Sequence, residues 1–324
     1  MGKGKSKNSK IRILFFGTPK FGDAVLNGLI ENNYKPVSVI ANPDKAVGRS
    51  KELTSPPTKI LAQKYNIPVF QPVKLKDSSV IQKIKDISPD LIVVAAYGKI
   101  IPKEILDIPK YGSLNVHASI LPRWRGASPI QFAILNGDKN TGVTIMLMDE
   151  EMDHGPILTQ KEIKISAKET VASLHDKLAD LGTKLLLKTI PDWISGKIKP
   201  AKQEENETTY TKILTKEDGK IIWAKNAEDI ERQIRAFSNW PTSFCFWKKN
   251  KELLRIKILE ANFNNQNKNE LAYGKVFLTE NKELAVNCGE GYLVIKILQL
   301  EGKKAMSQEE FLKGNPDVIG TVLE

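Results

Sequence analysis

Two side chains that could act together on a reacting group, Asn115 and His117, lie two positions apart in the chain. In an extended segment, positions i and i+2 point to the same face, so the amide and the imidazole can converge on one point. Such a pair can stabilise negative charge on an oxygen when a carbonyl group is transferred to an amine. A nearby carboxylate would favour the charged imidazole and could relay a proton. Four acidic residues further along the chain could supply it, namely Asp149, Glu150, Glu151 and Asp153.

The elements around these residues predict an open α/β fold. Apolar runs at residues 11–17, 37–42 and 90–98 alternate with helix-period stretches such as 21–32, which is typical of a mostly parallel, Rossmann-like sheet covered on both faces. Such sheets bind ligands beyond the carboxyl ends of their strands. The strand ends at Gly17, Asn42, Tyr97 and Asn115 to His117 should therefore share one mouth.

The first strand ends in a glycine, but its motif does not indicate a nucleotide site. Gly17 and Gly22 have four residues between them. This stretch matches neither the Gly-x-Gly-x-x-Gly motif of dinucleotide-binding folds nor the phosphate-binding loop of nucleoside triphosphatases. Gly17 is instead interpreted as a position where the backbone approaches a flat ligand.

The segments SLNVHASILPRWRGASPIQ (113–131) and TGVTIMLMDEEMDHGPIL (141–158) together carry a recognisable pattern. Asn-x-His, then Ser-x-Leu-Pro, a small-residue loop and a later aspartate resemble the formyltetrahydrofolate-dependent transferases. The resemblance covers residues 11–324 and is strongest from 89 to 158. It selects Asp153 among the four acidic residues, and it implies formyl transfer with Asn115, His117 and Asp153 as the catalytic residues. His154 and His175 receive no role and are interpreted as structural or solvated.

The same resemblance implies where the co-substrate, 10-formyltetrahydrofolate, would bind. The loop of Ser119, Ile120, Leu121 and Pro122 matches the folate-contacting loop of the family. The strand end at Tyr97, Gly98, Ile100 and Ile101 would add apolar walls and backbone groups for a pterin, next to Gly17. No cluster in the sequence calls for a metal ion.

A long basic segment after the second strand predicts an anionic partner. Residues 41–59 exceed a usual connection in α/β folds and carry Lys45, Arg49 and Lys51. By resemblance this is a tRNA-contacting loop, and the implied acceptor is the free α-amino group of methionyl initiator tRNA. Two alternatives remain: a folate enzyme acting on a small amine, such as a ribonucleotide amine or an amino-sugar nucleotide, and a non-catalytic RNA-binding protein.

The second half of the chain predicts a smaller domain. A helix is expected from about Glu169 to Ile194, with a leucine stripe on one face. We expect a catalytic domain at 11–195, a linker at 196–209 and a tRNA-binding, OB-like β-barrel at 210–324. Its basic residues, at 248, 249, 251, 255 and 257, would have to cluster to bind phosphates. The chain departs from the family at Thr242, where glycine commonly follows Trp-Pro.

Composition limits the remaining possibilities. The 324 residues carry 49 Lys and Arg against 38 Asp and Glu, a formal charge of +11, and the excess lies in the first 200 residues. Residues 1–10 read as a disordered basic tail. The sequence contains no long apolar run and only two cysteines, Cys245 and Cys288, without disulfide or metal spacing. We therefore expect a cytoplasmic protein, and a monomer.

Overall fold

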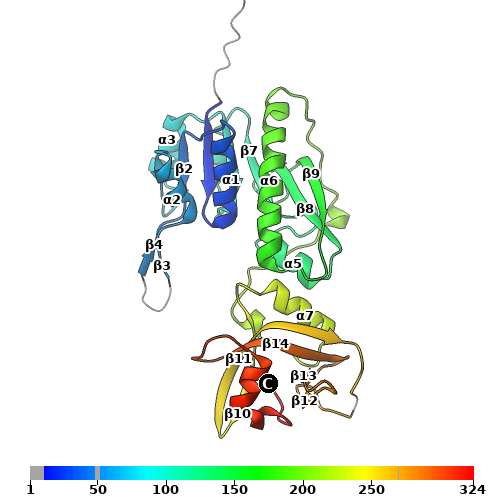
Figure 1. Ribbon diagram of the computed structural model, residues 1–324. Coiled ribbons are helices and arrows are strands. Elements are labelled where there is room, and N and C mark those ends of the chain that lie inside the picture. Colours follow the sequence, from blue (N-terminus) through cyan, green and yellow to red (C-terminus); the bar gives the residue numbers. More distant parts are fainter. Residues whose placement is uncertain (1–10, 48–51, 269) are drawn as a thin grey trace, which may run out of the picture. The chain divides into compact units, whose positions relative to one another are not determined.

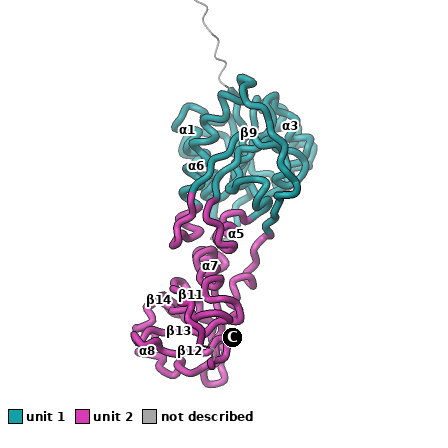
Figure 2. Tube along the Cα trace, turned by 90° about the vertical axis from the view of Figure 1, so that its right-hand side faces the viewer, with its two compact units in different colours: residues 1–127, 141–163, 175–211 teal, residues 128–140, 164–174, 212–324 magenta. Residues whose placement is uncertain are grey.

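The computed structural model describes residues 11–47, 52–268 and 270–324, so the predicted basic tail lies outside the described residues (Figure 1). The chain forms two compact units (Figure 2). The first, the N-terminal unit, holds residues up to Ala127 with Thr141–Ile163 and His175–Thr211, and the second, the C-terminal unit, holds Ser128–Asn140, Lys164–Leu174 and Lys212–Glu324. The three-part division at residues 195 and 209 stays a prediction.

A seven-stranded sheet forms the centre of the N-terminal unit. The strands lie in the order β5-β2-β1-β6-β7-β8-β9, and the pairings of β5, β2, β1, β6 and β7 are parallel, whereas β8 runs antiparallel to β7. The predicted mostly parallel, Rossmann-like sheet is thus confirmed. The strand bounds are β1 Ile13–Gly17, β2 Ser38–Ile40, β5 Val69–Phe70, β6 Leu91–Ala95, β7 Ser113–His117, β8 Asn140–Leu147 and β9 Ile157–Lys164.

Helices cover both faces of this sheet. Helices α3 (Ser78–Ile87) and α4 (Lys103–Leu106) pack on the face that carries Leu14 and Phe16. On the other face lie α1 (Lys20–Glu31), α2 (Pro57–Lys64) and α6 (Val171–Ile194) (Figure 1). Alternate residues of β1 are therefore buried on opposite sides, which explains why the strand reads as a continuous apolar run. The predicted helix at 169–194 agrees with α6.

The segment at 41–59 contains more structure than the sequence predicts. Strands β3 (Lys45–Val47) and β4 (Glu52–Thr54) pair antiparallel, with Lys45 opposite Thr54. A hairpin of three-residue strands leaves too little alternation to be recognised in a sequence. Its connection, residues 48–51, is not described.

The C-terminal unit contains antiparallel β-structure, as predicted. Its strands lie in the order β10-β11-β14-β13-β12, with β15 beside β14. The bounds are β10 Ser243–Lys249, β11 Glu252–Asn264, β12 Val276–Leu278, β13 Leu284–Asn287, β14 Tyr292–Leu300 and β15 Met306–Ser307. Three helices accompany it, α5 Pro129–Leu135, α7 Ala227–Ala236 and α8 Gln308–Gly314, and the short 3-10 turns of the chain are η1 Glu205–Glu207, η2 Glu217–Gly219 and η3 Pro316–Val318.

The last residues of the chain join the two outer strands of this sheet. The backbone of Glu324 exchanges two hydrogen bonds of 2.8 Å with Phe246 on β10. The amide of Leu323 donates to Gly274 beside β12 at 2.9 Å. The terminal segment thereby closes the sheet into a barrel, which removes its exposed edges.

Thr242, where the resemblance implies a glycine, adopts a backbone conformation that favours glycine. Its φ is +71°, in the left-handed region that disfavours a β-branched residue. The amide of Thr242 donates to the carbonyl of Phe237 at 3.1 Å, which keeps the turn closed after α7. The departure from the family is thus accommodated locally in the turn.

Candidate active site

The carboxylate of Asp153 lies at the centre of a cluster at the carboxyl end of β7. Its Oδ1 accepts a hydrogen bond from Asn115 Nδ2 at 3.2 Å and lies 3.5 Å from His117 Nδ1. Its Oδ2 accepts from the backbone amide of Gly126 at 2.8 Å. The three residues selected in the sequence are therefore neighbours in space, contributed by β7 and by the loop between β8 and β9.

The imidazole of His117 is held between two acceptors. It is 6% exposed, and its Nε2 lies 3.1 Å from the carbonyl oxygen of Trp124. Its Nδ1 faces the Asp153 carboxylate, so an oxygen atom lies beside each ring nitrogen. These two contacts hold the ring in one orientation beside the Asn115 amide.

The strand geometry explains why the side chains of Asn115 and His117 lie together. In β7 they face Met146 and Thr144 of the antiparallel strand β8. Asn115 also lies opposite Val94 at the end of β6. Residues two apart on a strand share a face, so both side chains reach Asp153 from the same side of the sheet.

The loop that follows β7 is anchored by polar side chains from β8 and β9. Thr144 Oγ1 donates to the Ser119 carbonyl at 2.7 Å and accepts from the Leu121 amide at 3.1 Å. Gln160 donates to the Leu121 carbonyl at 2.7 Å. The backbone groups of Ser119 and Leu121 thus hold the loop in place, while Ile120 and Pro122 are partly exposed.

The four strand-end residues chosen for a pterin site fall into two pairs. Tyr97 and Ile101 are buried in the core cluster under α3 and α4, and burial raises the pKa of Tyr97 to about 12. Gly98 has φ +77° with open space around its Cα, and Ile100 is 76% exposed. Only the second pair presents its own surface to a ligand.

Gly17 is surrounded by the protein itself. A methyl group there would lie 2.6 Å from the ring of Phe15 and 2.9 Å from the carbonyl of Ala95. The missing side chain is therefore required by the packing of β1 against β6, whatever ligand binds nearby.

Comparisons with known proteins agree with this geometry. A family model described as formyl transferase matches residues 9–190, and one described as the formyl transferase C-terminal domain matches residues 213–316. The chain belongs to the formyl transferase family.

Two curated relatives match this formyl transferase over almost its whole length. A protein named methionyl-tRNA formyltransferase from Bacillus velezensis is 44% identical over 96% of this chain and 97% of its own. A protein of the same name from Citrifermentans bemidjiense is 42% identical over 94% of this chain and 93% of its own.

Solved structures share the fold at lower identity. A sugar 3N-formyl transferase, WlaRD, solved with dTDP and 5-N-formyl-THF, has a TM-score of 0.63 at 22% identity and covers 91% of this chain and 99% of its own. HypX from Aquifex aeolicus, solved with tetrahydrofolic acid, has a TM-score of 0.61 at 17% identity and covers 94% of this chain and 47% of its own. At such identities the likeness concerns the fold alone.

Several polar residues at the site of this formyl transferase could not be predicted from the sequence. Gln203 is 9% exposed and donates to the backbone carbonyls of Asp153 and Gly155, at 2.8 Å each. Thr209 accepts from the Trp124 amide at 2.9 Å. Both residues belong to the polar segment predicted as a linker, whose composition gives no sign that it packs on the site.

The basic hairpin is described only in part. Lys45 is exposed on β3, while Arg49 and Lys51 lie outside the described residues. The base of the hairpin is fixed at Asp44, which accepts from Gln71 at 2.8 Å and pairs with Lys59 at 2.7 Å. These hydrogen bonds, with that of Gln71 first, lower the pKa of Asp44.

Two of the five basic residues proposed on the barrel have partners within it. Lys249 donates to Asn315 at 2.9 Å and pairs with Asp317 at 3.2 Å. The guanidinium of Arg255 lies 3.6 Å from the ring centre of Phe244. The remaining three lysines, at 248, 251 and 257, belong to β10, the following turn and β11.

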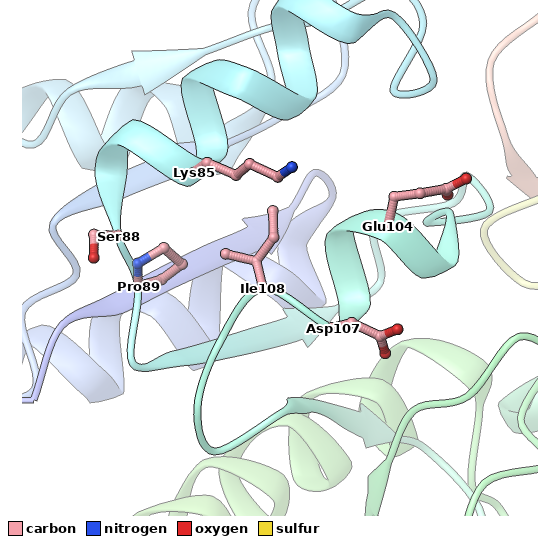
Figure 3. A pocket seen from close by; sticks show the side chains of 6 residues that line it. All are labelled: Lys85, Ser88, Pro89, Glu104, Asp107 and Ile108. Atoms are coloured by element: carbon pink, nitrogen blue, oxygen red, sulfur yellow. The ribbon is translucent and has the colours of Figure 1, made fainter.

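A surface depression of about 460 Å³ lies at the opposite end of the sheet (Figure 3). Ser88 and Pro89, which precede β6, line it, with Glu104 and Asp107 at α4. The cluster of Asn115, His117 and Asp153 lies at the carboxyl ends of the strands, so the depression has no part in it.

The other two histidines have local partners. His154 Nδ1 donates to Asp149 at 2.6 Å, and His175 packs edge-on against Phe21 at 5.6 Å between ring centres. In residues 11–47, 52–268 and 270–324, no group of three or more His, Cys, Asp and Glu side chains could hold a metal ion. No helix of the described chain is long and apolar enough to cross a membrane.

Proposed function

We propose that this protein transfers the formyl group of 10-formyltetrahydrofolate to the α-amino group of methionyl initiator tRNA, the step that prepares this tRNA for translation initiation. The cluster of Asn115, His117 and Asp153 at the end of β7 carries the chemical part. The acceptor rests on full-length relatives named methionyl-tRNA formyltransferase.

Each residue of the cluster has a role that follows from its contacts. The amide nitrogen of Asn115 has two hydrogens, so it can contact Asp153 and still donate to an oxygen that gains negative charge. His117 can reach the reactants by exchanging the Trp124 carbonyl for a reacting atom at Nε2. The imidazole of His117 then takes up the proton of the attacking amine and delivers it to the leaving nitrogen, and the Asp153 carboxylate stabilises the ring while it carries this proton.

The strand end beside the cluster suits a folate. When bound, 10-formyltetrahydrofolate supplies the formyl carbon that the amine attacks. Ile100 presents an exposed apolar side chain, and Gly98 lets a flat ring approach the backbone. The loop of Ser119, Ile120, Leu121 and Pro122 would form the rest of the pocket, and Tyr97, Ile101 and Gly17 would support it from the core without contacting the ligand.

Basic residues of the N-terminal unit and the barrel of the C-terminal unit would bind the tRNA acceptor. Lys45 on β3, together with Arg49 and Lys51, which follow it in the sequence and lie outside the described residues, would contact the phosphates or unpaired bases at the acceptor end of the tRNA. The C-terminal barrel would hold another part of the tRNA. Both contacts would weaken at high salt, because they depend on phosphate charges.

A single assay with labelled formyl donor tests this proposal. The purified protein would receive formyl-labelled 10-formyltetrahydrofolate together with methionyl initiator tRNA, free methionine or an amino-sugar nucleotide. We expect label on the tRNA alone. Label on the amino-sugar nucleotide or on methionine instead would overturn the acceptor, and label on none would overturn formyl transfer itself.

We also propose that the protein works as a monomer in the cytoplasm. Its two cysteines are free and buried, which suits a reducing compartment. Light scattering would give the mass of one chain, 36.2 kDa, if the monomer is correct. A mass near twice that value would contradict it.

A further inference from the structure

The backbone of Asp153 is held in a conformation that it would not adopt unaided. Its φ is +53°, in the left-handed region, where a residue other than glycine carries a cost of about 1 kcal/mol or more. Asp153 lies in a turn of the β8–β9 loop, and a methyl group at Gly155, two residues on, would lie 1.9 Å from the carbonyl oxygen of Leu147. A side chain with this backbone needs contacts that keep its carboxylate aimed at β7.

The amide of Gln203 supplies one such contact from the backbone side. Its Nε2 donates to the carbonyl oxygens of both Asp153 and Gly155, so it joins the two residues that flank His154. Because the amide nitrogen only donates and the amide oxygen only accepts, the two hydrogen bonds form only when Nε2 of Gln203 faces the two carbonyl oxygens. The bridge touches no atom of the carboxylate.

Arg125 fixes the other end of that amide. Its Nε donates to Gln203 Oε1 at 3.0 Å, and its two terminal nitrogens donate to Glu205 at 3.2 and 2.7 Å. The residue is only 1% exposed, and burial works against its charge, but its interactions with Glu205 and Tyr210 together outweigh burial and raise the pKa of Arg125. A buried guanidinium fixed at both ends gives Gln203 little freedom to rotate.

The next residue completes a clamp around Asp153. Gly126 donates its amide to Asp153 Oδ2 at 2.8 Å. Its φ of +112° places its Cα where a methyl group would lie 2.7 Å from the carbonyl of Thr211. Arg125 and Gly126 therefore hold Asp153 from both sides, one through Gln203 on the backbone and one directly on the carboxylate.

We propose that Gln203 is a positioning residue for formyl transfer, which sets the direction of the Asp153 carboxylate toward Asn115 and His117 through the Asp153 backbone. The proposal rests on the proposed function for its kinetic consequence, although the contacts themselves do not. It gives the polar segment after α6 a role in catalysis, since the segment supplies a residue without which the catalytic carboxylate is poorly aimed.

Gln203→Met tests the proposal because it keeps the length and volume of the side chain and removes the bridge. We expect kcat to fall about 100-fold, the loss typical of a catalytic group displaced by about 1 Å, with KM for both substrates changed less than about 3-fold. Gln233→Met is the matched control. Gln233 is also buried and donates to two backbone carbonyls, at 3.3 and 3.4 Å, but within the C-terminal unit. We expect Gln233→Met to lower the free energy of unfolding by an amount similar to that of Gln203→Met and to leave kcat unchanged.

A second readout does not depend on activity. The chain has three histidines, so the imidazole nitrogen resonances of His117 can be assigned, with His175 as the internal reference. In Gln203→Met the Nδ1 resonance of His117 should shift, because the carboxylate 3.5 Å away moves, while that of His175 stays. Gln233→Met should leave both unchanged.

The outcomes separate the two proposals. If the wild-type protein transfers no formyl group, the proposed function fails, and the His117 resonance still decides whether Gln203 positions Asp153. A folded Gln203→Met with wild-type kcat, or with an unchanged His117 resonance, would overturn the positioning role. If Gln203→Met does not fold, Gln203→Asn keeps an amide one methylene short of the two carbonyls, and the same two readouts apply with a smaller expected loss.

Discussion

The amide of Asn115 has a neighbour that limits what it can do at rest. It donates to Asp153, so in the proposed reaction only its remaining hydrogen would be available to a reacting oxygen. Such a donor acts mainly in the transition state. This makes the residue a sharp probe of the proposed chemistry, because its loss should affect turnover and leave substrate affinity unchanged.

Asn115→Ala should lower kcat by about 10²- to 10³-fold, the loss typical of one oxyanion donor, with the Kd for methionyl initiator tRNA unchanged. His117→Ala should behave likewise. Asn136→Ala is a suitable control, because Asn136 makes the same kind of contact with a carboxylate, Asp138 at 2.8 Å, on the surface. Near-normal turnover of Asn115→Ala, measured by single-turnover formylation, would remove this residue from the mechanism.

His154 follows Asp153 in the chain, but its pKa is set by a different carboxylate, that of Asp149. Its hydrogen bond to Asp149 raises its pKa above the ordinary value of 6.5. A raised pKa in the folded state means that this contact stabilises the fold fully below about pH 6.5 and loses its effect as the pH rises through the folded pKa.

Asp149→Asn should therefore lower the pKa of His154, and the stability difference from wild type should be present at pH 5.5 and absent at pH 9. Imidazole NMR titration and urea unfolding at the two pH values measure both effects. His175→Gln, which leaves this pair intact, serves as the control. A stability difference that is the same at both pH values would contradict the assignment.

At this scale the sequence predicts only what spacing and motif can carry. Asn115 and His117 can be selected from their i, i+2 spacing. Asp153 can be selected only by the family resemblance, because spacing alone does not distinguish it from the three acidic residues that precede it. Gln203 could not be found, since a buried bridge from a polar segment depends on contacts between residues 50 positions apart. The roles of all four remain predictions for experiment.

Helices α1 and α6 meet through one small residue. Gly28 of α1 lies against Thr183 of α6, and a methyl group at residue 28 would overlap the γ-methyl group of Thr183 while lying 3.3 Å from its Cβ. The glycine is costly within a helix, by about 0.5 to 1 kcal/mol relative to alanine, so close packing is its reason.

Gly28→Ala should lower the free energy of unfolding by about 1 to 3 kcal/mol, despite its better helix propensity. Adding Thr183→Ser removes the overlapping methyl group and keeps the hydroxyl that donates to Ala179 at 2.8 Å, so it should recover most of the loss. A double-mutant cycle by chemical denaturation measures this coupling, with Thr183→Ser alone as the reference. Additive effects of the two changes would show that the helices do not meet as described.

Elements were predictable where periodicity is long and uniform. The runs that became β1 and β6 and the leucine stripe of α6 stand out in the sequence, because a covered sheet and an amphipathic helix need those patterns. The β3–β4 hairpin cannot be recognised in the sequence, because its strands have only three residues each. The segment after α6 looks like a linker by composition, but its residues contact the site through hydrogen bonds that composition does not reveal.

At the scale of the whole chain, each compact unit has its own core, and the C-terminal one depends on the last residues. Leu323 is 4% exposed and belongs to a cluster with both cysteines, whereas its neighbour Val322 is 44% exposed. Burial raises the pKa of Cys245 and Cys288 to about 12, so their thiols should react only when this unit opens.

Leu323→Ala should therefore destabilise the C-terminal unit by about 2 to 5 kcal/mol, because it leaves a cavity where the terminal segment closes the barrel. Labelling of Cys245 and Cys288 by a thiol reagent at neutral pH would then become at least about 30-fold faster, since the population of the open state rises with the lost free energy. Val322→Ala, an exposed truncation one residue away, should change the labelling rate little. Equal rates for the two variants would mean that the terminal segment does not hold the barrel closed.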